Sequence, residues 1–342
     1  MKKLVGMKLL LSQYVLRSDS EIDSASILGY GQNHLEDVIR SRVMQTTATG
    51  TIPLGSVSMP LPGDFLEFDN LVIIDGATRY VFEDYRDINY LVSVRTTETG
   101  LPKELAHFED TLYFDRYTDR LLTFELKYYR RLPNFGDIAL STPVNATFTA
   151  GSGTLTEAAT HYYRVSAFNG WGQTLASTET FKVVTSTGGI NVNWAAVSGA
   201  HGYKIYGRTT SAELLMATVY GEQTTTWLDD GSVTPAGALP SANTTAPEDS
   251  SSNYWSQKYE EALLLSSLVK LCRYLIEEPR EKQWKLSLEE EIAKIKANEE
   301  KALPKDSTIK YRGYSARTGT TTNSASGSSV LGSVVVIDGG GA

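Results

Sequence analysis

Apolar residues near the amino terminus recur at the three- and four-residue spacing of amphipathic helices. Residues 2–16 predict a first helix with a leucine-rich face. Leu35, Val38 and Ile39 fall on one face of a second helix, which the pattern places at about 24–44. Two short helices cannot enclose a core alone, so we expect them to pack against helices from elsewhere in the chain.

Strand patterns follow these helices. Residues 71–74 form a short apolar run that ends at Asp75-Gly76, a dipeptide typical of tight turns. Residues 111–114 and 121–129 predict a pair of strands, and apolar and polar side chains alternate along the second one. This region therefore predicts a small β-sheet beside the helices.

Residues 141–247 differ in composition, because they are rich in Thr, Ser, Gly, Ala and Val and poor in Lys and Glu. Strand-like runs recur there at 161–169, 190–194, 199–206 and 225–231, the last of which includes its closing turn. Short strands at such intervals, with turn residues between them, are typical of a β-sandwich of about 100 residues.

The alternation also predicts which side chains fill the core of this sandwich, because every second residue of a strand faces inward. The tyrosines could instead form a sugar-binding platform, but packing in the core is the favoured interpretation. The expected core residues are Tyr163, Val165, Trp194, Tyr203 and Ile205.

Helical spacing returns between residues 253 and 303. Leu264, Leu268 and Leu271 predict one helix, and Pro279 ends that helix or starts the next. The next helix mixes acidic and basic residues along its length. Such mixing is typical of a solvent-exposed helix face.

A tail rich in Ser, Thr and Gly begins near Pro304. Residues 330–337 differ from the rest of the tail, because they are mostly β-branched and uncharged before Asp338. An exposed segment of this kind is prone to aggregate, so we expect it to add a strand to the sheet of a partner protein. The expected partner-binding residues are Val330, Leu331, Val334, Val335, Val336 and Ile337.

The overall composition argues against several classes of protein. Of the 342 residues 41% are hydrophobic, and the formal net charge is -8, which argues against a dedicated nucleic-acid binder. A single cysteine, Cys272, excludes an internal disulfide and any zinc-binding spacing. Lys8 interrupts the first apolar stretch, which favours an amphipathic helix over a signal peptide, and no apolar run is long enough to span a membrane.

The sequence contains no recognisable motif for catalysis, phosphate binding or metal binding. The four histidines lie in no HExxH or HxH spacing, and no GxSxG, Walker A or GxGxxG motif occurs. Carboxylates cluster at 115–120 and at Asp229-Asp230, where turns after strands are favoured over hydrolytic pairs. Gly29 and Gly31 predict a helix bend. We therefore expect no enzyme activity, no cofactor and no metal site.

These patterns predict an α+β chain of several domains. A helical-bundle domain with a small β-sheet would comprise residues 1–140 and 253–309, because each part supplies the apolar face that the other lacks. An all-β sandwich at 141–247 would interrupt this domain, since whole domains insert at exposed loops. Residues 310–342 would form an extended tail that docks on a partner.

The order of these patterns resembles one known family. The segments LPGDFLEFDNLVI (61–73) and LTFELKYYRRLP (122–133), followed by two terminal helices, resemble the head-to-tail adaptor proteins of tailed phages, also called connectors or tail tubular A-type proteins. Residues 161–177 and 190–208 resemble immunoglobulin- or fibronectin-III-like modules of phage structural proteins. The tyrosine-rich strand precedes the tryptophan strand, which departs from the usual fibronectin-III order.

The resemblance implies a structural protein of the virion. The chain would form a ring of twelve copies between the portal protein and the tail nozzle or tail tube protein, and tail fibres could attach to the ring. Double-stranded DNA would pass through without sequence-specific contact, since an acidic lining does not hold phosphates. Assembly would take place in the bacterial host cytoplasm, with no membrane involved.

Two other classes of function stay open. A tail-fibre or receptor-binding component would use the sandwich to hold a glycan, and an isolated 141–247 fragment would then bind that glycan. A glycan hydrolase of the tail would need two suitably spaced carboxylates, and the sequence offers no recognisable pair.

Overall fold

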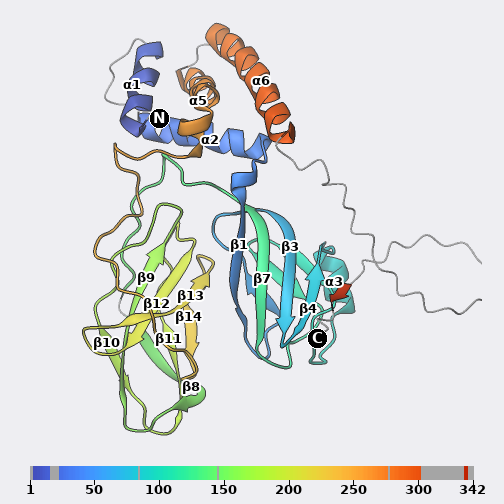
Figure 1. Ribbon diagram of the computed structural model, residues 1–342, viewed down its shortest axis with the longest axis vertical. Coiled ribbons are helices and arrows are strands. Elements are labelled where there is room, and N and C mark those ends of the chain that lie inside the picture. The colour runs from blue at the N-terminus through green and yellow to red at the C-terminus, as the bar shows by residue number, and fades with distance from the viewer. Residues whose placement is uncertain are drawn as a thin grey trace, which may run out of the picture. The chain divides into compact units, whose positions relative to one another are not determined.

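The computed structural model describes residues 3–15, 23–83, 85–144, 146–275, 278–301 and 335–337. Across these ranges the chain forms six α-helices and four antiparallel sheets, so the fold is mostly β (Figure 1). The predicted fold class is therefore wrong. The chain is not an α+β helical-bundle adaptor domain with a small β-sheet, interrupted by one inserted immunoglobulin-like sandwich.

The difference arises mainly in residues 45–128, where the sequence predicts one small sheet and the structure has two. The strand Gln45–Ile52 buries only Ala48 and Ile52, so no apolar run marks it in the sequence. Phe65–Asp75 is one continuous strand, although its polar residues divide it into two short runs. Pairing with neighbouring strands therefore overrides the local pattern here.

The helices and strands follow one another along the chain with these bounds. The helices are α1 (Leu4–Val15), α2 (Ser24–Val38), α3 (Ile88–Val94), α4 (Tyr254–Lys258), α5 (Glu260–Leu275) and α6 (Glu278–Lys301), with a 3-10 turn at Arg42–Met44. The strands are β1 (Gln45–Ile52), β2 (Ser58–Pro60), β3 (Phe65–Asp75), β4 (Thr78–Phe82), β5 (Leu105–Phe108), β6 (Thr111–Phe114), β7 (Leu122–Arg130), β8 (Thr147–Leu155), β9 (Thr160–Phe168), β10 (Thr180–Val183), β11 (Gly188–Asn193), β12 (Gly202–Arg208), β13 (Leu214–Tyr220), β14 (Thr226–Asp229) and β15 (Val335–Ile337).

By compactness the chain divides into two units. Unit 1 comprises Met1–Thr46, Pro60–Glu67 and Tyr129–Lys296, and unit 2 comprises Thr47–Met59, Phe68–Tyr128 and Ala297–Ala342. Unit 1 holds most of the helices and two of the sheets, and unit 2 holds most of the other two sheets. The boundaries 141 and 247 of the expected sandwich domain stay a prediction.

The helices of unit 1 enclose an apolar core. Met7 of α1, Leu35 of α2, Leu263 and Leu268 of α5 and Trp255 of α4 are all at most 2% exposed and belong to one cluster. Helices from both ends of the chain thus bury one another's apolar faces, which is the main source of their stability.

Two glycines set how closely α2 packs against its neighbours. A Cβ at Gly31 would lie 2.3 Å from Ser267 Oγ and 2.8 Å from Ser267 N, on α5. Ser266 Oγ, also on α5, donates a hydrogen bond of 2.9 Å to the Gly31 carbonyl. Gly29 faces Asn134 and Gly136 in a similar way. The helix runs through both positions, and the two glycines provide room for this close contact.

Replacing Gly31 with alanine is expected to destabilise the protein by about 1–3 kcal/mol, because the added methyl must push α2 away from the α5 backbone. Urea unfolding of Gly31→Ala measures this. Tyr30→Ala is the matched control, since Tyr30 is 58% exposed on the same helix. Equal stability of the two variants would contradict the close contact.

Two antiparallel sheets of unit 1 share a second apolar core. Their strand orders are β10-β9-β12-β13 and β14-β11-β8. Tyr163 and Val165 on β9 and Tyr203 and Ile205 on β12 are 0% exposed, and Trp194, directly after β11, is 6% exposed. The structure places all five expected core residues in this one cluster.

The larger sheet of unit 2 has the strand order β1-β7-β3-β4-β15 (Figure 1). β3 and β4 form a hairpin whose register pairs Asp75 with Thr78, and Gly76 lies in the turn with a φ of 60°. A left-handed backbone suits glycine, so the turn falls where Asp75-Gly76 predicts it. Along β7, buried residues such as Leu126 alternate with more exposed ones such as Lys127. The smaller sheet has the order β2-β6-β5.

Candidate functional site

The carboxyl-terminal strand β15 lies along β4 at the edge of the larger sheet of unit 2 (Figure 1). The pairing is antiparallel, and its register joins Val335 with Val81, Val336 with Tyr80 and Ile337 with Arg79. Strand β15 therefore satisfies main-chain groups of β4 that would otherwise form an open edge.

The six expected partner-binding residues fall into two groups. Val335, Val336 and Ile337 form β15 and pair with a sheet of their own chain. The other three, Val330, Leu331 and Val334, lie outside the described residues. The expectation that this segment adds to a sheet thus matches the strand β15, while its addition to a partner protein stays a prediction.

Strand β4 is also paired with β3, on the side opposite to β15. It pairs with β3 over five residues, and Phe82 at its end is 6% exposed. Arg79 forms an ion pair with Glu125 on β7, reaching across the sheet. Because side chains alternate along a strand, Arg79 and Val81 share one face and Tyr80 and Phe82 the other. The edge of β4 pairs with β15 in this way, and main-chain pairing of this kind is a recurring mode of peptide recognition.

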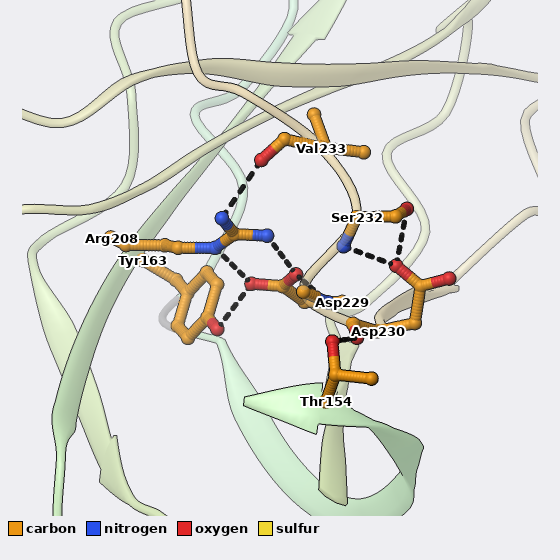
Figure 2. A network of polar contacts seen from close by, with 8 residues as sticks. Thr154, Tyr163, Arg208, Asp229, Asp230, Ser232 and Val233 are labelled. Carbon is orange, nitrogen blue, oxygen red and sulfur yellow. Dashed lines mark hydrogen bonds and ion pairs between the residues drawn. The ribbon is translucent and has the colours of Figure 1, made fainter. Parts of the chain in front are cut away.

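A second candidate is a closed polar network in the sheets of unit 1, which Figure 2 shows. Asp229, at the end of β14, has a side chain that is 0% exposed. Arg208 Nε donates to its Oδ2 at 2.8 Å and Arg208 Nη2 to its Oδ1 at 2.5 Å. Tyr163 donates its hydroxyl to Oδ2 at 2.8 Å. The network joins β9 and β12 of one sheet to β14 of the other, so it fastens the two sheets together.

The side chains bonded to Asp229 stabilise the fold. Burial and the neighbouring carboxylate of Asp229 raise the pKa of Tyr163, so its hydroxyl stays protonated as a donor. Hydrogen bonding to Asp229 likewise raises the pKa of Arg208. Arg208 Nη1 also donates to the Val233 carbonyl at 2.8 Å, and Asp230 caps the turn by accepting from Ser232 N at 2.9 Å. Asp229-Asp230 is therefore a turn at the end of a strand, and its carboxylates are engaged in holding that turn and the two sheets.

A third candidate is the buried carboxylate of Glu36 on α2, which is 0% exposed. Its Oε1 accepts hydrogen bonds from Gln32 Nε2 at 2.9 Å and Trp255 Nε1 at 3.0 Å. Its Oε2 is buried without a hydrogen-bond partner. Burial raises the pKa of Glu36 to about 7, against the opposing influence of these two donors and of Arg131. Glu36 is thus a buried group that changes charge near neutral pH.

The same network fixes two passages of the chain against α2. Gln32 Nε2 donates to the carbonyls of Leu132 at 3.2 Å and Pro133 at 3.1 Å. Asn253 Nδ2 donates to Gln32 Oε1 at 2.7 Å, and the Asn253 side chain also caps α4. The chain therefore meets α2 at Gln32 both before and after the strands of residues 147–229. This side chain network serves to hold those passages in place.

A histidine beside a carboxylate is a further polar feature of the described residues. His201 Nδ1 lies 3.8 Å from Asp64 Oδ2, and burial lowers the pKa of His201. Where the structure describes the chain, no three or more His, Cys, Asp or Glu side chains gather in a way that could hold a metal ion. None of the helices in these ranges is long and apolar enough to cross a bilayer.

Comparison with known proteins adds no family. No protein-family model matches the chain, and no curated protein matches its sequence. Among the described residues, the strand β15 on the edge of β4 is the feature best suited to an intermolecular contact.

Proposed function

We propose that this chain is a structural protein of a phage virion, which forms a head-to-tail adaptor ring between the portal and the tail. The ring would extend the channel through which double-stranded DNA passes. The proposal combines the order of motifs along the sequence with a terminal strand that can pair with a sheet edge. The alternative is a tail-fibre or glycan-binding component of the tail.

The two sequence motifs that resemble adaptor proteins come together in the fold, which supports the proposal. Residues 61–73 and 122–133 supply β3 and β7, which are neighbouring strands of one sheet. Their ends also meet, because Arg131 N donates to the Asp64 carbonyl at 2.7 Å. The motifs thus form one structural element, although they are far apart in the sequence.

The observation that carries the proposal is the position of β15 at the edge of a sheet. Closed rings are built from heterologous contacts, in which one surface of each copy meets a different surface of the next. A terminal strand and a sheet edge are two such different surfaces. Strand addition is also a recurring mode of docking between proteins. The net charge of -8 fits a channel through which DNA slides without binding.

The oligomeric state of the purified full-length chain tests this function. Electron microscopy and native mass spectrometry are expected to show a closed ring with a central channel, alone or bound to portal protein. A ring of twelve copies would agree with the expected stoichiometry. A trimeric rod would contradict the adaptor function and favour the tail-fibre alternative.

Deleting residues 310–342 is expected to leave a folded protein that does not assemble, because the deletion removes β15 and none of the two apolar cores. Circular dichroism and thermal unfolding check the fold, and native mass spectrometry checks assembly. A truncated chain that still forms the same ring and joins the portal would show that the tail has no docking role.

A further inference from the structure

The strand β15 is attached to the edge of β4 by a short stretch of pairing. Strand β15 contributes three residues to the pairing, against five for β3 on the other side of β4. A hydrogen bond between main-chain groups contributes roughly 0.5–1.5 kcal/mol net, because water competes for the same groups. Three paired residues therefore give a contact that can break and form again readily.

The covalent connection does not require β15 to stay on its own sheet. Residues 302–334 separate the end of α6 from β15. At about 3.3 Å per residue, a chain of that length can reach up to roughly 100 Å. The strand can therefore reach the β4 edge of an adjacent copy as well as its own.

If β15 paired with β4 of another copy, every contact between the two strands would be preserved. Val335–Ile337 would meet the same three residues, Arg79, Tyr80 and Val81, in the same antiparallel register. Such exchange of an identical element is a low-cost route to assembly, since no new interface has to be formed. When copies are held side by side, the neighbouring edge is present at a high local concentration.

The geometry points to strand exchange: β15 of one copy pairs with β4 of the adjacent copy. The inference rests on the proposed ring and names the contact that links its members. Each copy donates its carboxyl-terminal strand and accepts one from its neighbour. A closed ring of such contacts leaves no β4 edge unpaired, so it also protects the sheet from unspecific aggregation.

Disulfide trapping in the observed register tests the exchange. Two full-length proteins are prepared in a Cys272→Ala background, one with Tyr80→Cys and the other with Val336→Cys. These two positions are paired across the strands. Paired residues of antiparallel strands have Cα atoms about 4.5–5.5 Å apart, within the range that a disulfide bridges. The two proteins are mixed, assembled, oxidised and separated without reductant.

A covalent dimer in the mixture is the expected result, because each protein carries one cysteine and the bond must join two copies. The double variant Tyr80→Cys/Val336→Cys is expected to give a ladder of covalent multimers. The matched control pairs Val336→Cys with Tyr90→Cys, since Tyr90 is 48% exposed on α3 and has no register with β15. If Tyr80→Cys fails to fold, Val81→Cys with Val335→Cys tests the same register from the opposite face of the strand.

The outcomes separate this inference from the proposed function. A ring whose double variant gives only monomers closed by an internal disulfide would overturn strand exchange and leave the adaptor function standing. Covalent multimers without a ring would support exchange and contradict the adaptor function. Dimer formation equal to that of the Tyr90→Cys control would reflect random collision and would also overturn the exchange.

Discussion

Replacing Glu36 with glutamine is expected to stabilise the protein by about 3 kcal/mol at pH 8 and to have a much smaller effect at pH 5. The pKa of Glu36 is about 7 in the folded protein, against an ordinary value of 4.5. The folded state therefore holds this proton more tightly than the unfolded state does. The protonated Glu36 side chain contributes fully to the stability of the fold below about pH 4.5, and this contribution is lost as the pH rises through about 7. A pKa difference of this size between the folded and unfolded states corresponds to about 3 kcal/mol of unfolding free energy.

Glutamine suits this position because of how the carboxylate is bonded. Only Oε1 accepts hydrogen bonds, from Gln32 and Trp255, and Oε2 is buried without a partner. A glutamine can keep its own Oε1 in the same place and carry no charge at any pH. Urea unfolding at pH 5 and pH 8 measures the difference between the two proteins.

Glu98→Gln is the matched control for this prediction, since Glu98 lies on the exposed surface. It should leave both the stability and its pH dependence nearly unchanged. If the wild type and Glu36→Gln lose stability equally between pH 5 and pH 8, Glu36 does not titrate near neutral pH in the folded protein.

Replacing Arg208 with methionine is expected to cost about 3–5 kcal/mol of unfolding free energy, because it leaves the buried charge of Asp229 without its main partner. The Asp229 side chain is 0% exposed, whereas that of Arg208 is 20% exposed. Tyr163 and Gly231 N would still donate to Asp229, but neither carries a positive charge. Thermal and urea unfolding measure the loss.

The double variant Arg208→Met/Asp229→Asn gives the sharper comparison. Neutralising Asp229 removes the buried charge, so the double variant should be more stable than Arg208→Met alone. Arg120→Met is the control, since the Arg120 side chain is 51% exposed and its ion pairs with Asp75 and Asp119 contribute about 0–1 kcal/mol at most. A double variant as unstable as the single one would show that Arg208 acts through packing and not through charge.

The sequence predicts the long helices of this chain better than the strands of residues 45–128. Leu264, Leu268 and Leu271 repeat over a long helix, and such a period can be read from the sequence directly. β1 carries no comparable signal, because it is polar and buries only two residues. Its place beside β7 depends on a strand far along the chain, which no local pattern records. The predicted fold class is wrong for this reason.

The candidate sites were also predictable from the sequence only in part. The run of β-branched residues at 335–337 identifies β15 as a strand from the sequence, although its position on β4 does not follow from that run. Asp229-Asp230 predicts a turn, but not the bonds to Arg208 and Tyr163. Glu36 directly follows Leu35, which belongs to the apolar face of α2. The place of Glu36 in the sequence could have suggested a buried carboxylate. Its hydrogen bond with Trp255 could not be predicted, because the two residues are far apart in the sequence and the fold brings them together.

The attachment of two chain passages to Gln32 has a mechanical consequence. A force that pulls on the strands of residues 147–229 would reach the helices through Leu132-Pro133 on one side and Asn253 on the other. Both routes include the side chain of Gln32, one turn away from Glu36, and Asn134 adds bonds to α2 at Gly29 and Asn33. Loss of a proton by Glu36 and mechanical tension would then both act on hydrogen bonds of the Gln32 side chain.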